Sequence, residues 1–160
     1  MLEKKSDRLH EARQSYEKAV TIREAMSKAD PSDAVARGDL SEEYMKVSDV
    51  SLRLGDRVDA LNGYHRALAI REELVRANPD SAEGRAQLAR IHESLGAYFL
   101  SLAASGRRAD DWREARRWYQ LSLETFQGLQ QRNKLSADYA TKPDQLRKRI
   151  RTCDAALMKQ

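Results

Sequence analysis

The chain has 160 residues, 29 Lys and Arg against 25 Asp and Glu, and 41% hydrophobic residues, which suits one domain with a core of its own. It has one cysteine, Cys153, so an internal disulfide is excluded. A composition of 34% charged residues with only 7 Gly and 3 Pro favours long helices over strands. No apolar run is long enough to cross a membrane and the first residues are too polar for a signal peptide, so we expect a cytoplasmic protein.

Six helices are predicted along the chain, because apolar residues recur every three or four positions, the period of a helix face that packs on a neighbour. The predicted helices cover residues 3–29, 33–54, 57–77, 81–105, 110–133 and 142–158. Pro31 and Pro79 are expected to end the helices before them. Three pairs of acidic residues have the spacing of an N-cap side chain and an acidic residue three positions on, which together satisfy free backbone N–H groups. The pairs are Asp56 with Asp59, Asp80 with Glu83, and Asp111 with Glu114.

The predicted helix at 3–29 repeats 48 residues later. Its apolar stripe consists of Leu9, Ala12, Tyr16, Ala19 and Val20, and Ala12, Tyr16 and Ala19 return as Ala60, Tyr64 and Ala67. We interpret this helix as the second of a pair whose first helix is missing, which leaves a core face without a neighbour. We favour a chain cut from a longer array; self-association through residues 9–20 and a partly exposed stripe are the alternatives.

The segment 33–77 resembles the tetratricopeptide repeat (TPR), a helix–turn–helix unit of about 34 residues. The resemblance rests on Tyr44, Val47-Ser48, Gly55-Asp56, Ala60, Tyr64 and Ala67. It extends over residues 8 to 133, although the period of 48 is longer than that of the family. It implies an all-α fold, a right-handed superhelical stack of antiparallel helix pairs. We predict that Tyr64 and its equivalent Tyr119 are core residues.

The segment 81–133 is a further copy, with an insertion of seven residues near 104–110. The matching residues are His92, Leu95-Gly96, Asp111-Trp112, Ala115, Tyr119 and Ser122. Trp118 stands where the other copies have Ser15 and Gly63, so we expect it either to fill space made by the insertion or to form an exposed contact. Residues 1–160 are thus interpreted as a single domain.

The helix at 142–158 carries one apolar stripe on a basic cylinder, which is typical of the helix that caps an array. The stripe consists of Leu146, Ile150, Cys153 and Leu157. Residues 107–160 hold 13 basic against 7 acidic groups. The basic clusters are Arg107, Arg108, Arg113, Arg116 and Arg117, and Arg147, Lys148, Arg149 and Arg151. We favour a solvated helix face, with an acidic protein partner and nucleic acid as alternatives.

No catalytic or metal site is predicted. None of the three histidines, His10, His65 and His92, has a second ligand at a metal-binding spacing, and no glycine-rich phosphate loop is present. Cys153 has basic neighbours, but no His or Asn is placed to complete a nucleophilic site. We therefore expect a protein without enzymatic activity, metal or cofactor.

The resemblance to TPR proteins implies a scaffold that holds a peptide or protein on a concave face lined by the first helix of each pair. Carried over by position, the lining is Glu42, Met45, Asp49 and Arg53, followed by Arg90, Glu93, Ala97 and Ser101. The Lys and Asn by which some members grip a C-terminal carboxylate are missing. The long repeat resembles TPR regions of bacterial signalling proteins such as serine/threonine kinases, so a regulatory part of a larger signalling enzyme is a further alternative.

Overall fold

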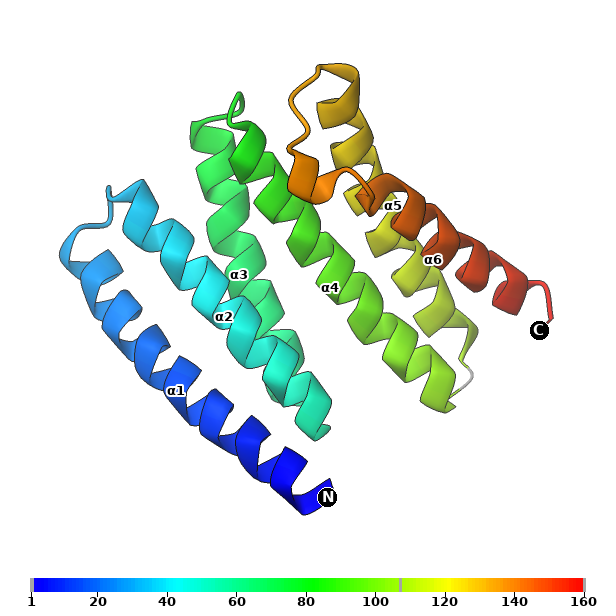
Figure 1. Cartoon of the computed structure of the whole chain (residues 1–160), viewed down its shortest axis with the longest axis horizontal. Coiled ribbons are helices and arrows are strands. Elements are labelled where there is room, and N and C mark those ends of the chain that lie inside the picture. The colour runs from blue at the N-terminus through cyan, green and yellow to red at the C-terminus, as the bar shows by residue number, and fades with distance from the viewer. Residues whose placement is uncertain (1, 107, 160) are drawn as a thin grey trace. The chain divides into compact units, whose positions relative to one another are not determined.

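The computed structural model describes residues 2–106 and 108–159, and these form an all-α structure without strands (Figure 1). The elements are α1 (Leu2–Ala29), α2 (Ala34–Leu54), α3 (Arg57–Ala77), α4 (Ala82–Gly106), α5 (Ala109–Gln131), the short 3-10 helix η1 (Ala137–Tyr139) and α6 (Lys142–Leu157). The predicted α-helix ends differ from these by at most two residues. Within the described chain no helix combines the length and the apolar character needed to span a membrane.

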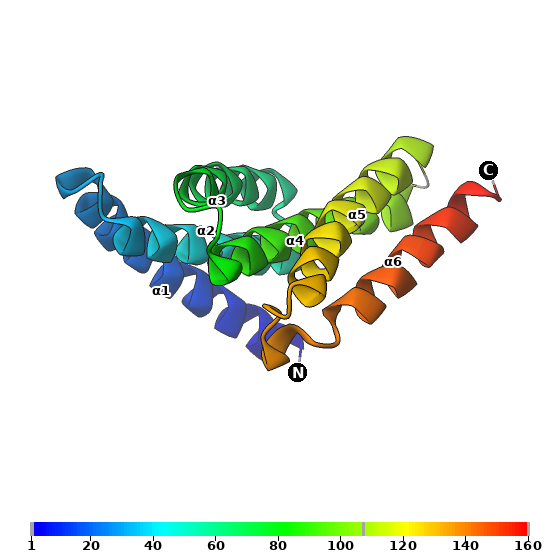
Figure 2. The ribbon, with the colours of Figure 1, turned by 90° about the horizontal axis from the view of Figure 1, so that it is seen from above.

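The contacts divide the chain between Ala77 and Asn78, which is where one predicted repeat ends and the next begins. Unit 1 comprises α1 to α3, and unit 2 comprises α4 to α6. In unit 1, α2 packs against both α1 and α3; in unit 2, α5 packs against both α4 and α6 (Figures 1 and 2).

The core of unit 1 forms where α3 packs on α2. Ala60, Tyr64 and Ala67 are at most 1% exposed, so the prediction that Tyr64 is a core residue is confirmed. The Ser41 hydroxyl on α2 donates to the Ala67 carbonyl at 3.1 Å. Small residues at positions 60 and 67 let the two helices approach closely enough for that bond.

Unit 2 repeats this arrangement with α5 on α4. The Ser122 hydroxyl donates to the Ala89 carbonyl at 2.8 Å, and Tyr119 is 1% exposed, as predicted for a core residue. Leu146 and Cys153 of α6 are fully buried in the same hydrophobic cluster. The apolar stripe of α6 therefore packs on α5, as expected for a helix that covers the end of a pair.

The helix caps agree only in part with the capping pattern. Asp56 caps α3, because its carboxylate accepts the backbone N–H three residues on, at 3.4 Å. The prediction for α4 is wrong: Ser81, not Asp80, accepts the N–H of Gly84, at 3.0 Å. The prediction for α5 is also wrong, since that helix begins at Ala109 and Asp111 lies inside its first turn.

Candidate functional site

The first four predicted lining residues lie along α2 in unit 1. Asp49 and Arg53 are exposed and Glu42 is half-buried. Met45 is only 5% exposed and belongs to the core, so it offers almost no surface to a partner. The polar part of this face is thus Asp49 with Arg53 one turn further on.

The other four lie along α4 in unit 2, where Ala97 is exposed and Arg90 and Ser101 are half-buried. Glu93 forms an ion pair with Lys142 of α6, with 2.7 Å between Nζ and Oε2. That pair ties the start of α6 to α4, so Glu93 already has a structural role.

Asp49 is held in place by the buried ring of Tyr64. The Tyr64 hydroxyl donates to Oδ1 of Asp49 at 2.6 Å. Burial and the neighbouring carboxylate raise the pKa of Tyr64, so the hydroxyl stays protonated and remains a donor. Since Asp49 is itself exposed, a fixed carboxylate faces solvent at this point of α2.

The equivalent positions of unit 2 lack this pair, because Ala97 stands 48 residues after Asp49. The Tyr119 hydroxyl is buried and finds no hydrogen-bond partner among the described residues. Burial raises the pKa of Tyr119 to about 12. The repeats therefore share a backbone arrangement but differ in the polar groups that they present.

Trp118, the predicted contact residue, is half-buried on α5. Its ring centroid lies 5.5 Å from that of His92 on α4, and the Arg117 guanidinium lies 5.7 Å from the Trp118 centroid. His92 is 8% exposed, and this burial lowers its pKa to about 4. Trp118 thus packs on a neutral imidazole at neutral pH and retains some exposed surface.

A cleft of about 350 Å³ lies in unit 1 among α1, α2 and α3, on residues that the sequence analysis did not select. Val20, Val47 and Gly63 provide its apolar part. The remaining lining residues are Arg13, Glu17, Thr21, Tyr44, Asp59, Asn62 and Arg66.

One side of this cleft is closed by Arg13 of α1. Its guanidinium contacts Glu17 at 2.7 Å, Asp56 at 2.9 Å and Asp59 at 2.6 Å. Hydrogen bonds, first to Glu17 and then to Asp56, raise the pKa of Arg13. Asp56 and Asp59 lie 43 and 46 residues from Arg13, and nothing in a single sequence signals pairing over such a separation.

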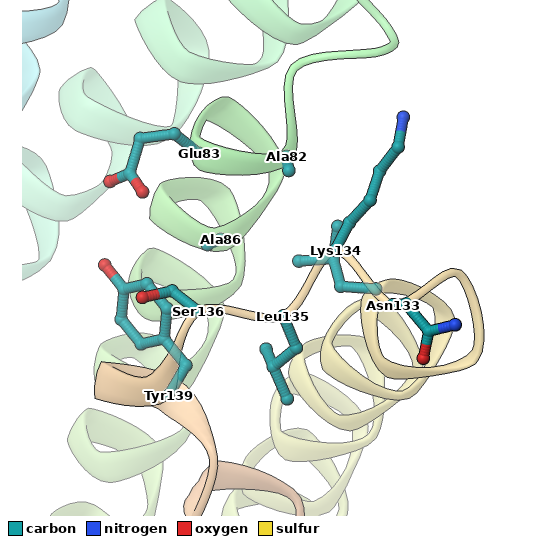
Figure 3. Close-up of a pocket in the computed structure, with 9 residues that line it drawn as sticks. Ala82, Glu83, Ala86, Asn133, Lys134, Leu135, Ser136 and Tyr139 are labelled. Carbon is teal, nitrogen blue, oxygen red and sulfur yellow. The ribbon is translucent and has the colours of Figure 1, made fainter.

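A second cleft, of about 330 Å³, lies in unit 2 between the start of α4, the end of α5 and the loop that leads to η1 (Figure 3). Ala82, Ala86 and Leu135 contribute apolar surface. Figure 3 shows Glu83 and the Tyr139 hydroxyl on one side of the cleft, whereas Lys134 extends away from it. This cleft could not be predicted from the sequence, because an irregular loop carries no periodic signal.

Four arginines of the two predicted basic clusters form ion pairs. On α5, Arg113, Arg116 and Arg117 line a shallow hollow of about 320 Å³. Their respective carboxylate partners are Asp110, Asp154 and Glu114. On α6, Arg147 pairs with Asp144, while Lys148, Arg149 and Arg151 are exposed. Arg107 lies outside the described residues.

Across residues 2–106 and 108–159 there is no group of three His, Cys, Asp or Glu side chains that could hold a metal ion. Cys153 is buried, and burial raises the pKa of its thiol. No protein-family model, curated protein or solved structure matches the chain. The TPR-like interpretation therefore depends on the motif residues and the internal repeat of this sequence, and it stays a proposal.

Proposed function

We propose that the chain is a non-catalytic interaction module that binds a peptide or protein on the exposed face of its first helices, in the manner of TPR proteins. The observation that carries this proposal is the fixed carboxylate of Asp49, which is exposed and yet hydrogen-bonded to the buried Tyr64 at 2.6 Å. A polar group that is already oriented loses less conformational entropy when it binds a partner than a mobile one does.

The charges on this face favour a partner that carries both signs. Arg53 is exposed one turn beyond Asp49, so α2 presents a carboxylate and a guanidinium in sequence. A partner with a basic group opposite Asp49 and an acidic group opposite Arg53 would be complementary. The right-handed stack and the cytoplasmic location are parts of the same proposal, and a regulatory part of a larger signalling enzyme is an alternative to it.

The test is affinity capture from a native extract at physiological salt, with the partners identified by mass spectrometry. We expect Arg53→Glu with Arg90→Glu to abolish capture of the specific partner. The matched control, Arg147→Glu with Lys148→Glu and Arg151→Glu, is expected to leave it unchanged, because those side chains lie on α6. The opposite pattern would show that neither the exposed face of α2 nor that of α4 is a binding surface.

A variant of the tyrosine tests the role of Asp49 directly. Tyr64→Phe removes the hydroxyl and keeps the ring, so the fold is retained while the carboxylate loses its support. We expect weaker partner binding, measured by titration calorimetry with the captured partner. Unchanged affinity would mean that the orientation of Asp49 does not contribute.

The second candidate function is binding of nucleic acid or an acidic protein by unit 2. It is favoured by the exposed Lys148, Arg149 and Arg151, although the arginines of α5 are already paired with carboxylates. A steep loss of RNA or DNA affinity with rising salt would support this alternative. Absence of nucleic-acid binding at low salt would leave only the acidic protein partner.

A further inference from the structure

One helix face occurs three times in this chain and is covered twice. On α3 the face consists of Ala60, Gly63, Ala67, Ile70 and Leu74, and α2 lies on it. On α5 it consists of Ala115, Trp118, Ser122, Thr125 and Leu129, and α4 lies on it. In both pairs a serine hydroxyl bonds a backbone carbonyl across the interface, at 3.1 and 2.8 Å.

The third copy, on α1, is open. It consists of Ala12, Ser15, Ala19, Ile22 and Met26, which lie 48 residues before the α3 set. Ile22 is 61% exposed and Met26 45%, and Ala12 and Ala19 are only half-buried, whereas Ala60 and Ala67 are fully buried. Within unit 1, α1 packs on α2 through a different side.

The side of α1 that packs on α2 is defined by its polar contacts. Arg23 pairs with Asp39 of α2 at 2.9 Å, and Glu24 bonds the Tyr44 hydroxyl. Val20 lies in the cleft beside Val47 of α2. These residues are offset around the helix from Ser15, Ile22 and Met26, so packing on α2 leaves the third copy of the face exposed.

The two covered copies show what chemistry fits this face. In each pair the covering helix runs antiparallel to the helix that it covers. It has a small residue, Ser41 or Ala89, over the central position of the face, which is Ala67 or Ser122. A Cβ at Gly63 would overlap the Ser48 hydroxyl of α2. Because α1 has Ser15 at the place of Gly63, glycine in the covering helix where α2 has Ser48 would avoid this overlap.

Tyr16 adds a polar requirement. Its counterpart Tyr64 donates to Asp49, whereas the half-buried Tyr16 has its ring 5.8 Å from Nζ of Lys46 on α2, and its hydroxyl has no hydrogen bond among the described residues. A carboxylate one residue after the glycine, as Asp49 follows Ser48, would fill this place.

We propose that the open face of α1 is a docking site for one amphipathic helix of another polypeptide, antiparallel to α1. The helix carries Ser or Ala over Ala19, Gly over Ser15 and an acidic residue for the Tyr16 hydroxyl. This site uses residues of α1 and not the α2 or α4 residues proposed above to bind a partner, so either proposal can fail alone.

The chain supplies its own probe. A labelled peptide of residues 33–55 with Ser48→Gly has the required pattern, and its binding to the full chain is measured by fluorescence anisotropy. We expect the Ser48→Leu peptide to bind at least about tenfold more weakly, because leucine prevents the close approach at Ser15. Equal affinity of the two peptides would overturn the proposal.

Variants of the chain locate the bound peptide. Ser15→Glu with Ile22→Glu places two carboxylates in the open face at exposed positions and is expected to weaken binding at least about tenfold. The control, His10→Glu with Gln14→Glu, adds the same groups to another exposed side of α1 and is expected to have no effect. Binding that survives the first variant would show that the peptide displaces α2 instead, which refutes the site.

An isolated peptide of this length forms a helix only weakly, so a grafted chain gives a second measurement. Residues 33–56 with Ser48→Gly are joined directly before Leu9, which reproduces the spacing of α2 to α3. We expect a higher midpoint of thermal unfolding, and Ser15→Glu with Ile22→Glu is expected to cancel the increase. An unchanged midpoint would count against the site even if the peptide is unstructured.

Sedimentation velocity separates this occupant from a second copy of the chain. We expect a monomer over the concentration range in which the peptide binds. A dimer that Ser15→Glu with Ile22→Glu dissociates would replace the proposed occupant with α1 of a second copy, as in the self-association considered for residues 9–20.

Discussion

Gly96 of α4 is the position where a single methyl group should test the packing of unit 2. A Cβ built at Gly96 would lie 2.7 Å from both Cδ1 and Cε1 of Tyr119, which is closer than real Cβ atoms approach. The ring cannot move aside easily, because Tyr119 is only 1% exposed and packs in the core of unit 2. Gly96→Ala therefore has to displace a large buried side chain or push α4 away from α5.

Two opposing terms set the size of the effect. Forcing extra volume into a well-packed core costs about 1–3 kcal/mol of unfolding free energy. Alanine in a helix interior is more stable than glycine by roughly 0.5–1 kcal/mol. Gly96→Ala is thus expected to lower the free energy of unfolding by up to about 2 kcal/mol, the overpacking term being the larger.

Gly128 provides the matched control, since it also lies inside a helix, α5, and nothing lies within 4 Å of a Cβ built there. Gly128→Ala changes only the helix propensity, so its free energy of unfolding is expected to rise by roughly 0.5–1 kcal/mol. Urea unfolding followed by circular dichroism measures both variants. Their difference isolates the overpacking at Gly96, and two variants of equal stability would refute the close approach of α4 to Tyr119.

Three further predictions concern buried side chains. Tyr64→Ala is expected to lower the free energy of unfolding by about 3–5 kcal/mol, and Tyr64→Phe by only about 1 kcal/mol. Equal melting temperatures for wild type and Tyr64→Ala would invalidate the repeat alignment. The pKa of His92 is lowered to about 4, so between pH 6.5 and 4 the unfolded chain binds a proton that the folded chain does not, and stability falls as pH falls through this range. Between pH 7 and pH 5 this proton uptake lowers the free energy of unfolding by about 2 kcal/mol. His92→Phe should remove that part of the pH dependence, and an unchanged stability profile in the variant would contradict this assignment. Cys153 is fully buried with a raised thiol pKa, so a thiol reagent should modify it only as the chain unfolds; rapid modification of the folded chain would show that α6 does not stay packed.

The helix pairs could be predicted because they depend on residues close together in the sequence. The period of three to four apolar positions, with Tyr64 and Tyr119 at matching places, fixes which side of each helix is buried. Helix ends were harder. Both Asp80 and Ser81 are good capping residues, and the backbone conformation, which the pattern does not reveal, selects Ser81.

The polar contacts between helices could not be predicted from one sequence. Arg13 reaches Asp56 and Asp59, and Lys142 reaches Glu93, over more than forty residues. The family pattern places Met45 on the ligand face, but here it is 5% exposed. A lining carried over by position assumes that each helix has the same rotation about its axis as in the family, and a repeat longer than the usual TPR unit changes the packing that sets this rotation.

The comparison of α1 with α3 shows what a repeat does and does not determine. Tyr16 and Tyr64 occupy the same place in the same local pattern, yet Tyr64 is 1% exposed and Tyr16 is only half-buried. The pattern specifies the face that a helix presents; the burial of that face depends on a second helix. The hydrogen bonds of Ser41 and Ser122 to the carbonyls across their interfaces show how closely that helix approaches. The geometry shared by the two covered copies therefore indicates which contact the third copy lacks. The glycine and the acidic residue expected in the docked helix follow from that geometry.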